Sequence, residues 1–151
     1  MSKIKEEEIR KILPTKGPSF EEVKNYLKKY NKEYIVIKCG GSILNDQNLL
    51  NNFVNDISVL NKLGFIPVII HGGGKRISKK LNEAGIKSDF KNGLRVTDEK
   101  SISIVEDVLN KFNQEITEAL IKNGCDGQSI TNKKNNILLV ERENQDLGFV
   151  G

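Results

Sequence analysis

Two glycine-rich turns and one lysine are the features of this 151-residue sequence that could do chemistry. Lys38 stands just before Gly40 and Gly41, and a second apolar run ends in three consecutive glycines at 72–74. Each glycine costs a regular element about 0.5–1 kcal/mol relative to alanine, so a run of three indicates that the backbone must approach something closely. Glycine-turn amides and a lysine ammonium both bind phosphoryl oxygens.

Two widespread phosphate-binding motifs do not match the second turn. The pattern GxxxxGK[ST] is absent, and the dinucleotide fingerprint GxGxxG would need glycine at position 77, where the chain has Ile77. What remains is a general arrangement of a strand, a glycine turn and a helix whose first N–H groups point at an anion. IKCGGSIL at 37–44 repeats this unit. For either glycine run alone, an ordinary tight turn is the alternative.

For the two glycine turns to lie together, the strands that precede them must be neighbours in one sheet. Runs rich in β-branched residues at 34–39 and 66–71 predict two buried parallel strands. Because ligands of open α/β folds bind at the carboxyl edge of the sheet, we expect the two turns and Lys38 to converge on one phosphoryl group. An ammonium among apolar neighbours is costly unless it faces an anion. A lysine that reaches solvent at a sheet edge is the alternative.

Helical patterns separate the predicted strands. The stripes of apolar residues run from 49 to 63, over about 75–84, and from 102 to 120. QSIT at 128–131 and ILLVE at 137–141 predict further strands joined by a hairpin turn at KKNN. Alternating strands and helices with short loops indicate an α/β layered fold with a mainly parallel central sheet.

Residues 1–33 form a polar extension ahead of the first strand. Ser19 and Glu22 fit a capping box for a helix over 19–30, whose apolar residues fall on one face. This helix either packs on its own domain or is lent to a neighbouring subunit, and the sequence leaves both interpretations open.

Composition narrows the class of protein. With 37% hydrophobic and 29% charged residues and no apolar run of membrane length, the chain is expected to be globular, cytoplasmic and free of membrane contact. Lysines scattered among acidic residues, with only 6% aromatics, argue against a nucleic-acid partner despite a net charge of +4. Cys39 and Cys125 lack a CxxC spacing and there is one histidine, so neither a disulfide nor a set of protein metal ligands is predicted.

Four motifs occur in a fixed order: IVIKCGGSIL, VIIHGGG, NGLRVTD and DLGFVG. Together they resemble the N-terminal half of acetylglutamate kinases, in the amino acid kinase family, over about residues 34–151. The resemblance implies a three-layer αβα fold with a mainly parallel central sheet. Residues 34–151 would be the acyl-amino-acid-binding lobe, 1–33 an N-terminal helical extension, and the C-terminal nucleotide-binding lobe would be absent from this chain.

The resemblance also implies an activity. An acetylglutamate kinase transfers the γ-phosphoryl of ATP, with Mg²⁺, to the side-chain carboxylate of N-acetyl-L-glutamate, a step of arginine biosynthesis. Lys38 matches the lysine that binds phosphate and stabilises the transition state, and Gly40 and Gly41 match the first glycine turn around the phosphates. A glutamate-type carboxylate is already ionised at neutral pH, so the reaction needs charge neutralisation rather than a general base.

On the substrate side, Gly73 and Gly74 match the amides that contact substrate and the transferred group. Arg95, in the GLRVT context, matches the arginine that holds the α-carboxylate, a task that suits its planar guanidinium. His71 is expected to be structural, bonding a neighbouring backbone carbonyl.

The sequence departs from the complete family pattern. It stops in an apolar, glycine-containing stretch and lacks the family's C-terminal half, so we expect a fragment or one half of a split enzyme. The segment VLNKFNQEI, on the substrate side, is one residue shorter than the usual family pattern. Three alternatives remain: another amino acid kinase, the kinase-like domain of an acetylglutamate synthase, or a non-catalytic module that binds an amino acid. For an acetylglutamate kinase we expect a homo-oligomer, with ATP bound through the missing lobe.

Overall fold

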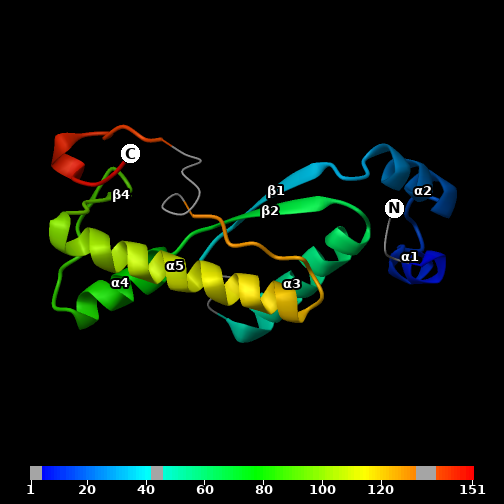
Figure 1. Cartoon of the computed structure of the whole chain (residues 1–151), viewed down its shortest axis with the longest axis horizontal. Helices are drawn as coiled ribbons and strands as arrows, with labels where there is room; N and C mark the ends of the chain where they lie inside the picture. The colour runs from blue at the N-terminus through cyan, green and yellow to red at the C-terminus, as the bar shows by residue number, and fades with distance from the viewer. Residues whose placement is uncertain (1–4, 42–45, 132–138) are drawn as a thin grey trace.

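The computed structural model describes residues 5–41, 46–131 and 139–151 (Figure 1). Helices α1 and α2 lie at one end of an elongated molecule, and α4 lies towards the other end. None of the described helices is long and apolar enough to cross a membrane. In chain order the elements are α1 (Glu6–Ile12), α2 (Phe20–Lys29), β1 (Tyr34–Cys39), α3 (Gln47–Lys62), β2 (Ile66–His71), α4 (Gly74–Glu83), β3 (Phe90–Lys91), β4 (Leu94–Arg95), α5 (Glu99–Lys122) and the 3₁₀ helix η2 (Gln145–Leu147).

Strands β1 and β2 form a parallel pair with the bounds that the sequence predicts. The register runs from Tyr34 opposite Ile66 to Cys39 opposite His71. The N–H of Gly72 donates to the carbonyl oxygen of Cys39 at 3.3 Å, which extends the pairing into the second glycine turn. In-register parallel pairing therefore brings the ends of both strands, and the turns that follow them, to one edge.

Helices α3 and α5 pack on one face of this pair. The side chain of Asp46 accepts hydrogen bonds from the first amides of α3, and Asp98 does the same for α5 by accepting from the Ser101 N–H at 2.8 Å. The predicted helical stripes are confirmed, because their apolar residues make the core with the end of β1. The buried cluster comprises Cys39, Leu50, Val54, Ile57, Phe112, Ile116 and Leu120.

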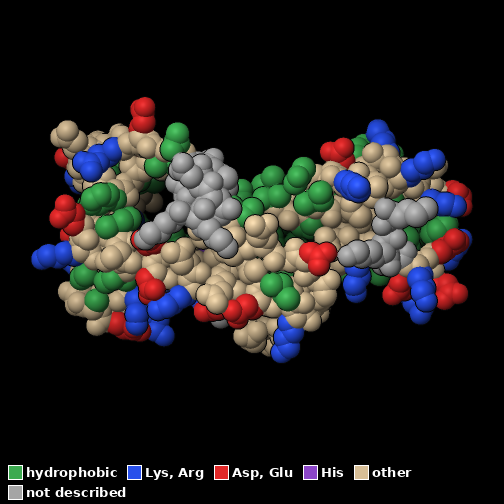
Figure 2. All heavy atoms as spheres, in the orientation of Figure 1, with side chains coloured by type: hydrophobic (Ala, Val, Ile, Leu, Met, Phe, Trp, Pro, Cys, Tyr) green, Lys and Arg blue, Asp and Glu red, His purple; other side chains and the backbone are tan. Residues whose placement is uncertain are grey.

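The other face of the strand pair carries exposed apolar side chains. Tyr34, Val36 and Ile70 are 71%, 64% and 52% exposed, and Figure 2 shows hydrophobic side chains gathered over β1 and β2. Strands that are apolar on both faces are typical of a parallel sheet covered by helices on two sides. The α/β class with a parallel sheet is confirmed, and the described residues provide the helical layer of one face.

The two strands predicted near the C-terminus are wrong where the structure describes them. Residues 128–131 and 139–141 belong to no strand, and 137–138 and the KKNN turn lie outside the described residues. Apolar, β-branched composition produces a strand only when a neighbouring strand is available for hydrogen bonding. The side-chain amide of Asn113 on α5 instead donates to the carbonyl oxygen of Ile130 at 3.1 Å.

A short hairpin, which the sequence analysis did not predict, lies between α4 and α5. Phe90 pairs with Arg95 and Lys91 with Leu94, in antiparallel register. The turn residues Asn92 and Gly93 have φ of 50° and 80°. Positive φ at both central residues is the mark of a type I′ turn, for which Asn-Gly is a preferred sequence. The hairpin sets the position of Arg95.

The N-terminal extension contains two helices. The predicted capping box of α2 is confirmed, since the Ser19 hydroxyl accepts from the Glu22 N–H and the Glu22 carboxylate accepts from the Ser19 N–H. Helix α1 was not predicted, and its Arg10 lies over the ring of Phe20 at 4.1 Å. No described side chain of α2 is buried. Whether α2 packs on its own domain or on another subunit stays open.

Candidate functional site

The two glycine turns lie in contact at the carboxyl edge of the strand pair. A Cβ added to Gly41 would stand 3.3 Å from the carbonyl oxygen of Gly72, and one added to Gly72 would stand 3.9 Å from the amide nitrogen of Gly41. The first distance is tighter than most Cβ contacts, so glycine at position 41 permits the approach of the two backbones. Gly40 is exposed beside it. The ligand of the two turns stays a prediction.

The second turn runs directly into helix α4. Gly73 is the N-cap residue and offers no side chain to accept hydrogen bonds from the first amides of the helix. A Cβ on Gly73 would meet Leu109 of α5 at 2.7 Å, whereas one on Gly74 would meet nothing within 4 Å. Gly73 thus lets α4 approach α5, and Gly74 opens the helix N-terminus, where backbone N–H groups favour an anion.

Lys38 lies one residue before the end of β1, on the exposed face of the strand pair. It is opposite Ile70 in the register, and its neighbour Cys39 points into the core. Within the described part of the chain its ammonium makes no hydrogen bond or ion pair. The structure therefore puts Lys38 close to the edge where the glycine turns meet, with its charge on the side away from α3 and α5.

Arg95 reaches from β4 to the first two turns of α4. Its Nη2 donates to the carbonyl oxygen of Gly74 at 3.1 Å and to the hydroxyl of Ser78 at 2.8 Å, and its Nη1 donates to the hydroxyl of Ser88. The guanidinium carbon lies 4.6 Å from the centre of the Phe90 ring. Burial lowers the pKa of the Arg95 guanidinium below its ordinary value, yet arginine stays protonated in proteins. A fixed cation thus stands beside the open helix N-terminus.

The motif DLGFVG docks against the motif that carries Arg95. The N–H of Thr97 donates to the carbonyl oxygen of Leu147 at 2.9 Å, and the N–H of Phe149 donates to the carbonyl oxygen of Thr97 at 2.7 Å. Gly148 has φ of 72°, and a Cβ there would stand 2.2 Å from the carbonyl oxygen of Thr97. Two motifs about fifty residues apart in the sequence are therefore joined at the same side of the site.

His71 packs below the second glycine turn. Its ring meets Phe112 edge-on, with centroids 5.1 Å apart, and Arg76 covers the Phe112 ring at 3.8 Å while pairing with Glu115. Burial lowers the pKa of the His71 imidazole and the charge of Arg76 lowers it further, against an opposing contribution from the Gly72 backbone. The Nδ1 atom has no hydrogen-bond partner within the described residues. This packing agrees with a structural role.

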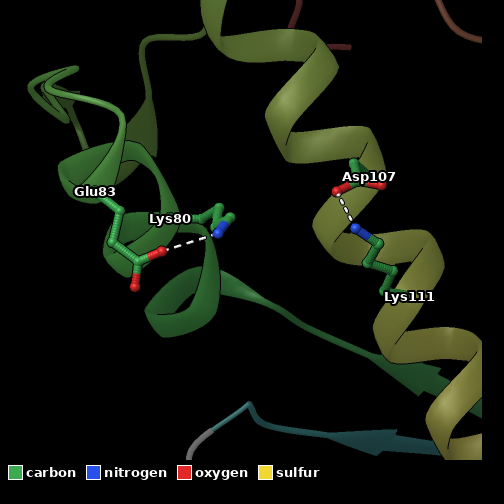
Figure 3. Close-up of polar contacts among 4 residues, drawn as sticks. All are labelled: Lys80, Glu83, Asp107 and Lys111. Carbon is green, nitrogen blue, oxygen red and sulfur yellow. Dashed lines mark hydrogen bonds and ion pairs between the residues drawn. The ribbon is translucent and has the colours of Figure 1, made fainter.

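A second surface feature lies between the C-terminal part of α4 and the middle of α5. A cavity of about 280 Å³ is lined by Lys80, Glu83, Ala84, Ser103, Ile104 and Asp107. Figure 3 shows that its carboxylates are paired, Glu83 with Lys80 at 2.9 Å and Asp107 with Lys111 at 2.8 Å. Exposed, mutually satisfied pairs contribute little binding energy. The glycine turns begin at the opposite end of α4.

Sequence reasoning found the glycines, Lys38 and Arg95 but missed the two serines that hold Arg95. The spacing of four residues from Gly74 to Ser78 places both on one face of α4, and that was the available signal for Ser78. Ser88 lies in an irregular connection, and no pattern in the sequence identified it.

Curated relatives resemble this chain over all or most of its length. The acetylglutamate kinase of Pelagibacter ubique (strain HTCC1062) is 60% identical over 151 residues, which are 100% of this chain and 52% of that protein. The acetylglutamate kinases of Pseudothermotoga lettingae and Campylobacter hominis are 39% and 44% identical over 86% and 83% of this chain, and over 47% and 45% of their own lengths. The chain thus spans about half the length of the curated relatives it matches.

Solved structures also resemble it. The N-acetylglutamate synthase from Neisseria gonorrhoeae, complexed with coenzyme A and N-acetyl-glutamate, superposes with a TM-score of 0.57 at 27% identity, over 70% of this chain and 24% of that chain. Its complex with coenzyme A and L-arginine gives a TM-score of 0.54 at 26% identity, over 74% of this chain and 25% of that chain.

The match to a family model covers most of the chain. Residues 33–147, from just before β1 to the end of η2, match the model of the amino acid kinase family. This range includes both glycine turns, Arg95 and the first two residues of the docked C-terminal motif. The chain belongs to the amino acid kinase family.

Proposed function

We propose that this chain is the substrate-binding half of an acetylglutamate kinase. The complete enzyme would transfer the γ-phosphoryl of ATP to the side-chain carboxylate of N-acetyl-L-glutamate, in the cytoplasm and as a step of arginine biosynthesis. The observation that carries the proposal is the 60% identity of the whole chain to an acetylglutamate kinase. In this proposal residues 34–151 are the acyl-amino-acid-binding lobe, residues 1–33 are an N-terminal helical extension, and the complete enzyme is a homo-oligomer.

The contact between the glycine turns supports a phosphoryl site at the carboxyl edge of β1 and β2. Lys38 is assigned to the transferred phosphoryl group and Gly40 and Gly41 to the ATP phosphates. The reacting carboxylate and the phosphate are both anions, so the main barrier is their repulsion. A lysine ammonium and backbone N–H groups lower this barrier by neutralising charge that develops in the transition state.

The N-terminus of α4, next to the two glycine turns, is assigned to the acyl amino acid. Gly73 and Gly74 contribute backbone amides at the N-terminus of α4, and Arg95 binds the α-carboxylate. Its contact with the Gly74 carbonyl oxygen at 3.1 Å supports this assignment, because it holds a cation next to those amides. The carboxylate to be phosphorylated needs no base, since its ordinary pKa of about 4.3 leaves it ionised at neutral pH.

Mg²⁺ accompanies ATP in this proposal. Mg²⁺ takes oxygen ligands and commonly binds through substrate phosphates. Within the described residues no group of three or more His, Cys, Asp or Glu side chains could hold a metal ion, and the N–H groups of the glycine turns cannot ligate a cation. The described residues do not fit a protein-held Mg²⁺ site, so the cation would be held by the phosphate oxygens and the other lobe.

A second candidate is the kinase-like domain of an acetylglutamate synthase. It is favoured by the structural likeness to the Neisseria gonorrhoeae synthase, at 27% identity. The higher identity of the kinase relatives makes the kinase the stronger proposal. A non-catalytic amino-acid-binding module is the third candidate.

The test uses a completed enzyme, in which this chain is fused after Gly151 to the remaining part of the Pelagibacter ubique relative. We expect it to form an acyl phosphate from N-acetyl-L-glutamate and ATP, trapped as the hydroxamate, and the 151-residue chain alone to form none. Acetyl transfer from acetyl-CoA to glutamate would instead support the acetylglutamate synthase as the function. Binding of N-acetyl-L-glutamate without either reaction would support the non-catalytic module.

A further inference from the structure

The guanidinium of Arg95 is held by three acceptors that come from two segments of the chain. Ser78 and Gly74 belong to the first two turns of α4, and Ser88 belongs to the connection between α4 and β3. The Phe90 ring closes one side of the group. An arginine side chain has several rotatable bonds, and contacts from three directions restrict it to one orientation.

The two serines do more than occupy space. A hydroxyl has one donor and two acceptor positions, so each serine that accepts from Arg95 keeps its own O–H to donate elsewhere. Arginine has five N–H donors, and the three hydrogen bonds to described residues leave the Nε–H and one Nη1–H for other acceptors. The Arg95 guanidinium is therefore fixed in position while some of its N–H groups remain able to donate.

We propose that Ser78 and Ser88 are positioning residues, which hold the Arg95 guanidinium at the N-terminus of α4 in the orientation that receives the α-carboxylate of the substrate. The inference rests on the proposed function, in which Arg95 binds that carboxylate. A side chain that is ordered before binding loses less conformational entropy when the ligand arrives. Loss of either hydroxyl should therefore weaken ground-state binding and leave the phosphoryl chemistry intact.

The first measurement is steady-state kinetics of the completed enzyme. We expect Ser78→Ala and Ser88→Ala each to raise KM for N-acetyl-L-glutamate about threefold to tenfold, the loss of one hydrogen bond, with kcat nearly unchanged. The α-amide of the substrate lacks the carboxylate charge, so its KM should change little. Ser78→Thr, which retains a hydroxyl, should keep the wild-type KM. The matched control is Ser103→Ala, since the Ser103 hydroxyl on α5 donates to the Lys100 carbonyl oxygen of its own helix, at 3.5 Å.

The second measurement is independent of turnover. In the completed enzyme labelled with ¹⁵N-arginine, a fixed guanidinium should give separate Nη signals for Arg95, identified by their loss in Arg95→Ala. The double variant Ser78→Ala/Ser88→Ala should merge them. Separate signals that persist in the double variant would overturn the positioning role, whatever the enzyme catalyses.

The two proposals fail in different ways. If Arg95→Ala abolishes the preference for acid over α-amide while the serine variants leave it intact, Arg95 binds the carboxylate without help from the serines and the inference is overturned. If Arg95→Ala also leaves the preference intact, the substrate role of Arg95 itself is wrong. Equal losses in Ser78→Ala and Ser78→Thr would assign the effect to packing and would likewise overturn the inference.

Discussion

Lys38 and Arg95 bring positive charge to the glycine turns from different elements, and we expect their replacement to have different kinetic effects. Lys38 is on the exposed face of β1 beside the turns. If its ammonium stabilises the transferred phosphoryl group, Lys38→Ala in the completed enzyme should lower kcat about 10²–10³-fold, the usual cost of one charge-stabilising donor. KM for N-acetyl-L-glutamate should change much less. An unchanged kcat would make Lys38 an ordinary solvated lysine, and Lys87→Ala, at a side chain 88% exposed, is the control.

Arg95 is expected to act on binding. A contact with the α-carboxylate exists in both the ground state and the transition state, so Arg95→Ala should raise KM with a smaller effect on kcat. A charge-assisted hydrogen bond contributes about 1.5–3 kcal/mol, which corresponds to a rise of roughly 10–150-fold. Arg95→Lys should restore only part of the affinity, because an ammonium lacks the planar donor geometry. Equal discrimination of acid and α-amide by mutant and wild type would rule out this role.

The neutral state of His71 gives the folded chain a pH dependence of stability. Burial holds the folded-state pKa below the ordinary value of about 6.5. As pH falls below about 6.5 the unfolded chain binds a proton that the folded chain resists, so stability is complete above that pH and decreases below it. His71 is the one histidine of the chain. In urea unfolding between pH 7.5 and 5.5, His71→Phe should show a flatter dependence than wild type, and equal slopes would contradict this.

At the scale of elements, the docking of the C-terminal motif depends on Gly148. Ala at this position would have a strained φ of 72° and a Cβ 2.2 Å from the Thr97 carbonyl oxygen. We expect Gly148→Ala to cost at least about 1–3 kcal/mol of unfolding free energy, measured in urea. Gly85→Ala is the matched control, since Gly85 has the same φ of 72° with nothing within 4 Å. Equal costs in the two variants would mean that the close approach to Thr97 is unimportant.

The sequence predicted the elements that are defined by local pattern. The bounds of β1 and β2 followed from two β-branched runs closed by glycines, and α3 and α5 followed from long apolar stripes ending at Gly64 and Gly124, which have φ of 101° and 86°. The hairpin of β3 and β4 was missed although Asn92-Gly93 is a strong turn signal. The absence of strands at 128–131 could not be predicted, because it depends on which neighbours are available for pairing.

The candidate site was predictable to a similar extent. The contact between Gly41 and Gly72 follows from parallel pairing, which any sequence with two consecutive strand–glycine units would suggest. The position of Arg95 beside α4 did not follow from local pattern, since it depends on how the hairpin folds back over the helix. The hydrogen bonds from Arg95 to Ser78 and Ser88 are tertiary contacts between ordinary polar residues, and these carry no sequence signature.

At the scale of the whole molecule, the exposed face of β1 and β2 is the feature that most needs explanation. An α/β sheet of parallel strands is normally covered on both faces, and the side chains of Tyr34, Val36 and Ile70 are apolar. The curated relatives are about twice as long as this chain. We infer that the rest of such an enzyme provides the second helical layer, which would also shield Lys38 from bulk water and strengthen its interaction with phosphate.

A substitution on this face should therefore have different effects in the isolated chain and in the completed enzyme. Val36 is 64% exposed here, so Val36→Thr should change the unfolding free energy of the 151-residue chain by no more than about 0.5 kcal/mol. In the completed enzyme the added hydroxyl would be buried, at a cost of about 1–3 kcal/mol. Val54→Thr is the control, because Val54 is a core residue of α3 that is only 5% exposed, and its replacement should destabilise both forms. Urea unfolding of the four variants and their parents measures these differences. If Val36→Thr is as harmless in the completed enzyme as in the chain alone, the face remains open to solvent and the sheet has a single helical layer.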